Sequence, residues 1–205
     1  LFDEASTSFR EVIRLQPSHP GAHALLGNAQ VEQGAFEAAT GNYRLALELR
    51  PDDAETLNNL GNALLELDKP HEAIDCYQRA LRLQPAYFSA IQNLGIAYLN
   101  AGQPEKAEAC SRQALQLNPD NPETLTNLGS ALVRQERAAE AMAHYRQALA
   151  LKPDHAGAHF NLGNAMRAQG KFEDAIDSYR KAIAIDAHHA DAHFNLASTY
   201  LALGM

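Results

Sequence analysis

The chain has 205 residues, of which 46% are hydrophobic, 7% aromatic and 20% charged, and its formal net charge at pH 7 is −8. Abundant alanine and leucine with few aromatic residues are typical of a mostly helical globular protein. The basic residues are scattered among more numerous acids, and no apolar run reaches the roughly 20 residues of a membrane span. We therefore expect neither a nucleic-acid nor a membrane partner.

The sequence predicts about 12 helices, which pair in repeats of 34 residues. Residues 1–19 are expected to hold a lone helix, the second of a truncated repeat. Complete repeats follow at 20–53, 54–87, 88–121, 122–155 and 156–189, and residues 190–205 hold a lone first helix. Apolar residues at three- and four-residue spacing make both helices of each repeat amphipathic. Since Leu1 begins in the middle of this pattern, we expect the chain to be a fragment.

Several small or rigid residues recur at the 34-residue interval. Prolines at Pro17, Pro51, Pro85, Pro119 and Pro153 end the second helices, because proline cannot continue the hydrogen-bond ladder. Glycines inside the first helices are Gly27, Gly61, Gly95, Gly129 and Gly163. They are predicted to let the paired helices approach closely. The aromatic residue of most second helices, such as Tyr43 or Tyr77, is predicted to pack toward the next repeat.

These features resemble the tetratricopeptide repeat (TPR) family through the pattern LGNA…G…A…Y…A…P, over essentially the whole chain. The resemblance implies an all-α solenoid, a right-handed superhelix of antiparallel helix pairs whose first helices line the concave face. The turn that closes the first helix holds Gly34, Gly102 and Gly170 in three repeats. Asp68 and Glu136 depart from the pattern, because they stand where glycine is expected.

One polar residue recurs at the sixth place of the first helices. Asn59, Asn93, Asn127, Asn161 and Asn195 hold this place, and the first repeat has Leu25 instead. The ninth place adds Asn28, Asn62 and Asn164, and Asn58 stands at a fifth place. Helical periodicity sets the sixth and ninth places on the side away from the paired helix. We therefore predict a ladder of amides along the concave groove.

Two interpretations of this ladder remain open. A carboxamide can donate to the C=O and accept from the N–H of an extended peptide, which indicates a sequence-tolerant polypeptide site. Alternatively, each asparagine hydrogen-bonds to the neighbouring first helix. Phe160 and Phe194, at adjacent fifth places, either clamp an apolar side chain of the partner or pack on neighbouring helices.

The ladder resembles the TPR region of O-linked N-acetylglucosamine transferases, which holds extended protein substrates, but this chain contains no glycosyltransferase domain. TPR domains that grip a C-terminal carboxylate use Lys and Arg at the fifth, second and sixth places, and this chain has neither residue at any of these places. The charged groove residues are Glu32, Glu55, Glu66, Glu123 and Asp191 against Arg134 and Arg167. This mildly acidic groove should prefer neutral to basic peptides.

Three histidine pairs at i, i+4 spacing could each share a metal: His19/His23, His155/His159 and His189/His193. Each pair lacks a third ligand, so packing and helix capping explain them, and we expect neither metal nor cofactor. No P-loop, nucleophile elbow or zinc-type spacing occurs, so we expect no enzyme. Cys76 and Cys110 are predicted to be reduced thiols on helix surfaces, which fits a cytoplasmic protein.

The terminal half-repeats suggest head-to-tail self-association. Phe2, Phe9 and Ile13 at one end, and Leu196 and Tyr200 at the other, are predicted to lack the helix that would cover them. The sequence thus favours a scaffold that binds a protein or extended peptide in its groove. The alternatives are the substrate-recruiting region of a larger enzyme, such as a glycosyltransferase, and a scaffold that assembles through its ends.

Overall fold

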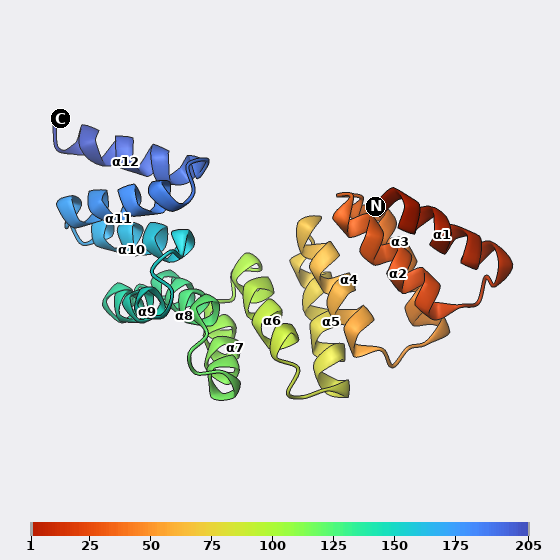
Figure 1. Cartoon of the computed structure of the whole chain (residues 1–205). Coiled ribbons are helices and arrows are strands. Elements are labelled where there is room, and N and C mark those ends of the chain that lie inside the picture. Colours follow the sequence, from red (N-terminus) through yellow and green to blue (C-terminus); the bar gives the residue numbers. More distant parts are fainter. Residues whose placement is uncertain (1, 205) are drawn as a thin grey trace. The chain divides into compact units, whose positions relative to one another are not determined.

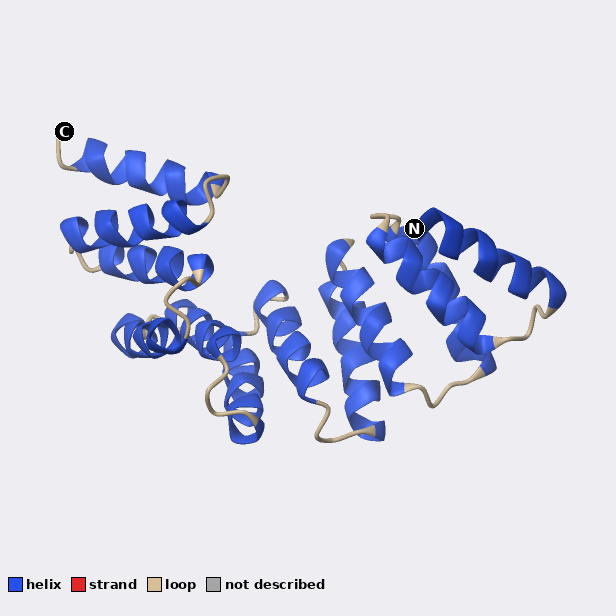
Figure 2. Ribbon diagram, viewed as in Figure 1, coloured by secondary structure: helices blue, strands red, loops and turns tan. Residues whose placement is uncertain are grey.

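The computed structural model describes residues 2–204, and within this range the chain forms twelve α-helices joined by short turns, with no strand (Figures 1 and 2). The helices are α1 (Phe2–Leu15), α2 (Pro20–Glu32), α3 (Phe36–Leu49), α4 (Ala54–Glu66), α5 (Pro70–Leu83), α6 (Phe88–Asn100), α7 (Pro104–Leu117), α8 (Pro122–Arg134), α9 (Ala138–Leu151), α10 (Ala156–Ala168), α11 (Phe172–Ile185) and α12 (Ala190–Ala202). The even-numbered helices are the first helices of the predicted repeats. No helix in this range is both long and apolar enough to cross a membrane.

The helices form two compact units, Leu1–Gly102 with α1–α6 and Gln103–Met205 with α7–α12. Within each unit, every helix packs against the next one in the chain. The even-numbered helices also touch one another, α2 with α4 and α4 with α6 in the first unit, and α8 with α10 and α10 with α12 in the second. The first helices of each unit therefore lie side by side.

Local sequence explains where several helices begin. The side chain of Asp53 accepts a hydrogen bond from the backbone N–H of Thr56 (3.1 Å), and that of Asn121 accepts one from Thr124 (2.8 Å). Each bond satisfies an N–H group that has no partner inside the helix. Proline stands in the first turn of α2, α5, α7 and α8, where its missing N–H costs no helical bond.

A residue with positive φ stands in the turn that follows each first helix. Gly34, Gly102 and Gly170 have φ values of 72°, 70° and 74°. Asp68 and Glu136 take the same place with φ values of 55° and 63°. The turn is therefore kept where the sequence lacks glycine, although a left-handed backbone costs a residue with a Cβ roughly 1 kcal/mol or more.

The tightest packing inside the repeats joins a tyrosine ring to a glycine. Tyr77 and Tyr145 are at most 1% exposed. A Cβ added at Gly61 would lie 2.5 Å from Cε1 of Tyr77, and one at Gly129 would lie 2.4 Å from Cε1 of Tyr145. The glycine thus makes room for the tyrosine ring of its own repeat. The prediction is more general, namely that the glycine lets the two paired helices approach each other. Tyr145 also belongs to a buried cluster that extends into the next repeat and includes Leu162.

Both cysteines are free, but their side chains are buried rather than on helix surfaces. Cys76 is 7% exposed and Cys110 is 8% exposed. Burial raises the pKa of each thiol to about 11, so both stay protonated at neutral pH. The prediction of surface thiols is wrong because both residues point into the helix packing.

Candidate functional site

The predicted amide ladder is present as hydrogen bonds between first helices. In the first unit, Asn59 on α4 donates from Nδ2 to Oδ1 of Asn28 on α2 at 3.2 Å, and Asn93 on α6 donates to Oδ1 of Asn62 on α4 at 2.9 Å. In the second unit, Asn195 on α12 donates to Oδ1 of Asn164 on α10 at 2.8 Å. In these three pairs the sixth-place asparagine ties its helix to the preceding first helix, as the second interpretation expects.

A buried tyrosine supports each of these bonds from the second helix. The hydroxyls of Tyr43, Tyr77 and Tyr179 donate to Oδ1 of Asn28 (2.8 Å), Asn62 (2.7 Å) and Asn164 (2.8 Å). Burial raises the pKa of all three phenols, so the hydroxyls remain donors at neutral pH. Sequence reasoning missed this contact, for which the only signal was the constant interval between the asparagine and the tyrosine.

The ladder is weaker where serine replaces the ninth-place asparagine. Oγ of Ser130 lies 3.4 Å from the hydroxyl of Tyr145, and Asn161 donates to the same Oγ at 3.4 Å. Asn127, on α8, is half-buried. The short serine side chain thus leaves the amide of Asn161 loosely held.

Asn58 differs from the other predicted ladder residues because it is only 5% exposed. It donates to Oδ1 of Asn59 at 3.3 Å and accepts from Nδ2 of Asn93 at 3.1 Å. Its amide is thus used to hold two ladder residues and is poorly placed to contact a partner.

Phe160 and Phe194 occupy the same place in their helices but have different surroundings. The ring centroid of Phe160 lies 4.7 Å from the His189 ring and 6.1 Å from the Tyr179 ring, and the side chain is half-buried. Phe194 is 70% exposed. Of the two, Phe194 therefore offers most of its ring to a partner.

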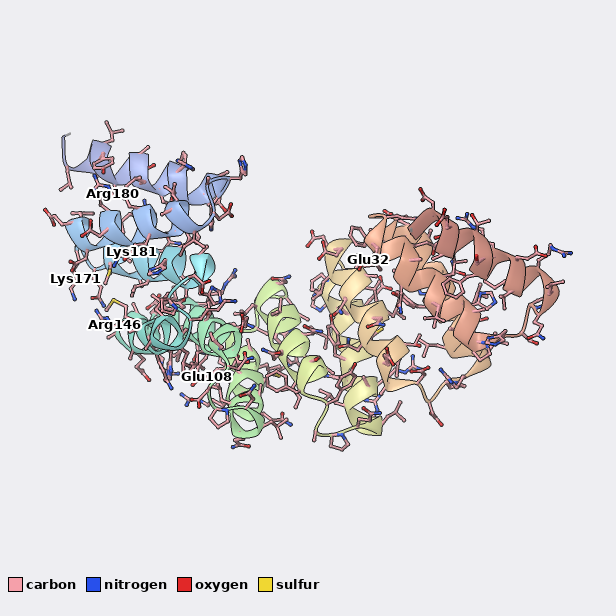
Figure 3. The ribbon with its side chains drawn as sticks, viewed as in Figure 1. Glu32, Glu108, Arg146, Lys171, Arg180 and Lys181 are labelled. Atoms are coloured by element: carbon pink, nitrogen blue, oxygen red, sulfur yellow. The ribbon has the colours of Figure 1, made fainter. Side chains whose placement is uncertain are left out.

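In the first unit, the acidic residues predicted to face the groove all carry exposed side chains. Glu32, Glu55 and Glu66 lie on α2 and α4 with side chains that reach solvent, and Glu32 is labelled in Figure 3. In the second unit, Glu123 lies 3.1 Å from Nζ of Lys152. Burial alone would raise the pKa of Glu123, but hydrogen bonds from the backbone and Lys152 lower it. That carboxylate is charged but already paired, so acidic character is strongest in the first unit.

The three histidine pairs hold the N-termini of α2, α10 and α12 by hydrogen bonds to the backbone. Nδ1 of the first histidine accepts from the backbone N–H three residues on, in His19–Ala22 (3.0 Å), His155–Ala158 (3.2 Å) and His189–Ala192 (3.4 Å). Nε2 of the second histidine lies close to a carbonyl of the preceding loop, in His23–Pro17 (2.9 Å), His159–Pro153 (2.9 Å) and His193–Ala187 (3.1 Å). The predicted capping role is confirmed. Among the described residues, no three His, Cys, Asp or Glu side chains gather as a metal site requires.

The residues of the terminal faces are partly covered. Phe9, Ile13, Leu196 and Tyr200 are half-buried, and the side chain of Phe2 lies outside the described part of the structure. Arg180 of α11, labelled in Figure 3, stands over the Tyr200 ring, with its Cζ 5.8 Å from the ring centroid. Leu201 is 79% exposed on α12.

Comparison with known proteins identifies the repeat. A TPR family model described as the Cilia and flagella-associated protein 70 C-terminal domain matches residues 3–205. A comparison with curated proteins finds no significant match.

Solved TPR structures share the fold. YrrB, described as a TPR protein with an unusual peptide-binding site, is 24% identical over 92% of this chain and 97% of its own, with a TM-score of 0.69. TTC0263, a thermophilic TPR protein of Thermus thermophilus, is 23% identical over 89% of this chain and all of its own (100%), with a TM-score of 0.75. A chain of the APC/C hetero-tetramer Cut9–Hcn1 is 19% identical to this protein, with a TM-score of 0.85. The match covers 100% of this protein and 41% of the APC/C chain. At this identity the likeness shows a TPR solenoid fold alone.

Proposed function

This chain belongs to the TPR family of the Cilia and flagella-associated protein 70 C-terminal domain, and we propose that it is a non-enzymatic scaffold that binds extended polypeptide along its first helices. TPR proteins generally act in protein–protein interaction. The proposal rests chiefly on one observation, the rows of half-exposed amides that cross adjacent first helices in each unit.

The amides keep hydrogen-bonding capacity that the fold does not use. A carboxamide has two N–H donors and an oxygen with two lone pairs, and Asn195 uses one donor toward Asn164. Each net hydrogen bond contributes about 1 kcal/mol, against roughly 4–15 kcal/mol lost on association. The ladder therefore needs an apolar anchor, and the exposed ring of Phe194 supplies one.

The preferred partner is a neutral to basic segment. The carboxylates of Glu32, Glu55 and Glu66 lie beside the amides of the first unit. Like charges at an interface oppose binding, whereas opposite charges speed the encounter. Binding should therefore weaken as salt is added when the partner carries Lys or Arg.

Binding to an array of twelve-residue peptides tests the proposal. We expect several neutral or basic peptides to bind the whole chain, and the Asn161→Ala, Asn195→Ala double variant and Phe194→Ala to lose affinity. Asn118→Ala is the matched control, because Asn118 is an exposed asparagine in the turn after α7. Circular dichroism checks that each variant is folded. If no peptide binds, or the groove variants bind as well as the control, the groove is not the working surface.

A second candidate is head-to-tail assembly through α1 and α12. Phe9 and Ile13 of α1 and Leu196 and Tyr200 of α12 are large side chains that are only half-buried, and Leu201 at the end of α12 is 79% exposed. In this proposal α12 of one molecule packs on α1 of the next, with Phe9 and Ile13 facing Leu196 and Tyr200.

Light scattering over a concentration series tests assembly. We expect the apparent mass to rise with concentration, and Leu201→Glu to keep the chain monomeric. A monomer at the highest concentration reached would rule out this assembly in solution.

A further inference from the structure

We infer that the buried tyrosine hydroxyls fix which atoms of the amide rows face the groove, so that donors and acceptors alternate along each row and match the main chain of an extended peptide. This inference rests on the proposed groove function and makes it specific. It assigns Tyr43, Tyr77 and Tyr179 as positioning residues and names the peptide main chain as the recognised group.

The ninth-place asparagines have their oxygens filled. Oδ1 of Asn62 accepts from the Tyr77 hydroxyl at 2.7 Å and from Nδ2 of Asn93 at 2.9 Å. An amide oxygen has two lone pairs, so this acceptor has no capacity left. The NH2 group of the exposed Asn62 is therefore the part that a partner can use, and it is a donor.

The other two complete sets repeat this arrangement. Oδ1 of Asn28 accepts from Tyr43 (2.8 Å) and Asn59 (3.2 Å). Oδ1 of Asn164 accepts from Tyr179 (2.8 Å) and Asn195 (2.8 Å). Both ninth-place amides are thus held with the oxygen turned inward.

In the sixth-place asparagines the NH2 group is used inside the fold and the oxygen is left for a partner. Asn93 donates from Nδ2 to Oδ1 of Asn58 at 3.1 Å and to Oδ1 of Asn62 at 2.9 Å, which uses both N–H groups. Its own oxygen is the remaining polar atom, and it is an acceptor. Asn59 and Asn195 likewise direct Nδ2 toward the preceding helix. Only α4 and α10 carry both kinds of asparagine on one helix. In the first unit the row from Asn28 through Asn59 and Asn62 to Asn93 therefore presents donor, acceptor, donor and acceptor in turn, with one lone pair of Asn59 Oδ1 left beside its bond from Asn58.

The spacing of the helices suits an extended chain. Packed helices lie about 8–10 Å apart, and a polyproline II segment rises about 3.1 Å per residue with three residues per turn, or about 9 Å per turn. One turn of such a segment would advance by one first helix, so the same face of its main chain would meet each donor and acceptor in succession. The partner fitted by this surface is a segment in polyproline II or similar extended conformation, read at every third residue.

The chain contains its own control. In the repeat of Tyr145 the ninth place is Ser130, whose contacts to Tyr145 and Asn161 are both 3.4 Å long. A serine carries no NH2 group to turn outward. Removing the Tyr145 hydroxyl should therefore have little effect on binding, although its ring fills the same kind of glycine space as that of Tyr77.

The test compares Tyr77→Phe with Tyr145→Phe on the whole chain. Phenylalanine keeps the ring beside the glycine and removes only the hydroxyl. The probes are the tightest-binding array peptide and its ester analogues, in which one residue at a time is replaced by the corresponding hydroxy acid, so that one main-chain N–H is lost while every side chain stays.

We expect ester penalties of about fivefold in affinity at positions three residues apart, the loss expected for one hydrogen bond. Tyr77→Phe should bind the parent peptide about fivefold more weakly, and its largest ester penalties should fall below about twofold because the Asn62 amide can now turn. Tyr145→Phe should differ from wild type by less than about twofold. Circular dichroism confirms folding, and a purely structural role of Tyr77 would leave the ester penalties unchanged.

The outcomes separate this inference from the proposed function. If no array peptide binds, the proposed groove fails and this inference fails with it. If the groove variants lose peptide binding but the ester analogues bind as well as the parent peptide, the proposed function holds and this inference is wrong. The same conclusion follows if the ester penalties are equal in wild type and Tyr77→Phe.

Discussion

At the scale of single residues, each glycine of a first helix and the tyrosine behind it form one packing unit. The ring of Tyr77 occupies the volume that a side chain at Gly61 would need, with Cε1 2.5 Å from the position of an added Cβ. Real Cβ atoms do not approach a ring this closely, so either the ring or the helix must shift. The same tyrosine also donates to Asn62, so a shift of the ring would also move the amide of Asn62.

We predict that Gly61→Ala lowers the free energy of unfolding by about 1–3 kcal/mol, because it overpacks the contact with Tyr77. Gly41→Ala is the control, since Gly41 lies inside α3 with no atom within 4 Å of an added Cβ. It should raise the free energy of unfolding by about 0.5–1 kcal/mol, the gain of alanine over glycine in a helix. Urea denaturation followed by circular dichroism measures both. Equal effects of the two variants would contradict the packing argument.

A single carboxylate links α7 to the turn between α8 and α9. Glu108, labelled in Figure 3, accepts from Arg112 (2.7 Å), Gln135 (2.9 Å) and Arg137 (2.7 Å). Burial alone would raise the pKa of Glu108, but these hydrogen bonds outweigh it and lower the pKa. The folded state therefore holds the charged form more tightly than the unfolded state does.

A depressed carboxyl pKa stabilises the fold above the pKa of the unfolded chain, and this contribution is lost as the pH falls through the folded pKa. We predict that Glu108→Gln lowers the free energy of unfolding by about 1 kcal/mol at pH 7, since its arginine partners are partly exposed. The difference from wild type should shrink below about pH 4. Urea titrations at about pH 7, 5 and 3.5 measure it, with the exposed turn variant Asp120→Asn as control. A difference that does not change with pH would rule out the ion pairs as its cause.

At the scale of helices and turns, the left-handed residue that follows each first helix is the point of local strain. Glu136 has a φ of 63° and lies between Gln135 and Arg137, which are two of the three residues that bind Glu108. Aspartate tolerates this conformation better than glutamate, because its short side chain can bond locally. The contacts of Glu108 help to hold a turn that its own sequence disfavours.

We predict that Glu136→Gly raises the free energy of unfolding by about 0.5–1 kcal/mol, and that Asp68→Gly gains less. Gly102→Ala should lose about 1 kcal/mol, because it places a Cβ at a φ of 70°. Thermal and urea unfolding of the three variants give the comparison. A loss of stability in Glu136→Gly would mean that the Glu136 side chain contributes more than its backbone costs.

The helices and their turns could be predicted from the sequence, whereas the direction of polar atoms could not. Periodic apolar residues fix each helix face, and the turn at Asp68 and Glu136 is closed by the same backbone hydrogen bonds as the turn at Gly34. The partners of Asn93 were not predictable, because they depend on how closely α6 approaches α4. Nor was the contrast between Phe160 and Phe194, since only the structure shows that the His189 ring covers the former.

At the scale of the whole molecule, each unit is a row in which a helix packs mainly against its neighbours. Stability in such a row is close to a sum of repeat and interface contributions, so it is not uniform along the chain. Among the described helices, α1 packs on α2 alone and α12 on α10 and α11, whereas α4 and α10 each contact helices on both sides. Helices α1 and α12 should therefore open more readily than helices with a neighbour on both sides.

We predict that amide hydrogen exchange is fastest in α1 and α12 and slowest in interior helices such as α4 and α10. Mass spectrometry of peptic fragments measures this gradient. A bound peptide should slow exchange most in the even-numbered helices. Uniform exchange along the chain would instead indicate that the helices unfold together.

The buried phenols also determine how this protein can be observed. The chain has no tryptophan and seven tyrosines, and Tyr43, Tyr77, Tyr145 and Tyr179 are all at most 1% exposed. Intrinsic fluorescence and the aromatic region of the circular dichroism spectrum therefore come from tyrosine without a tryptophan background. Much of this dichroism should come from the four buried rings, because their orientation is fixed between helices. The vibrational doublet of tyrosine responds to whether its hydroxyl donates a hydrogen bond. An unlabelled sample can thus report on the interior of its repeats, and single Tyr→Phe changes would assign each contribution to one repeat.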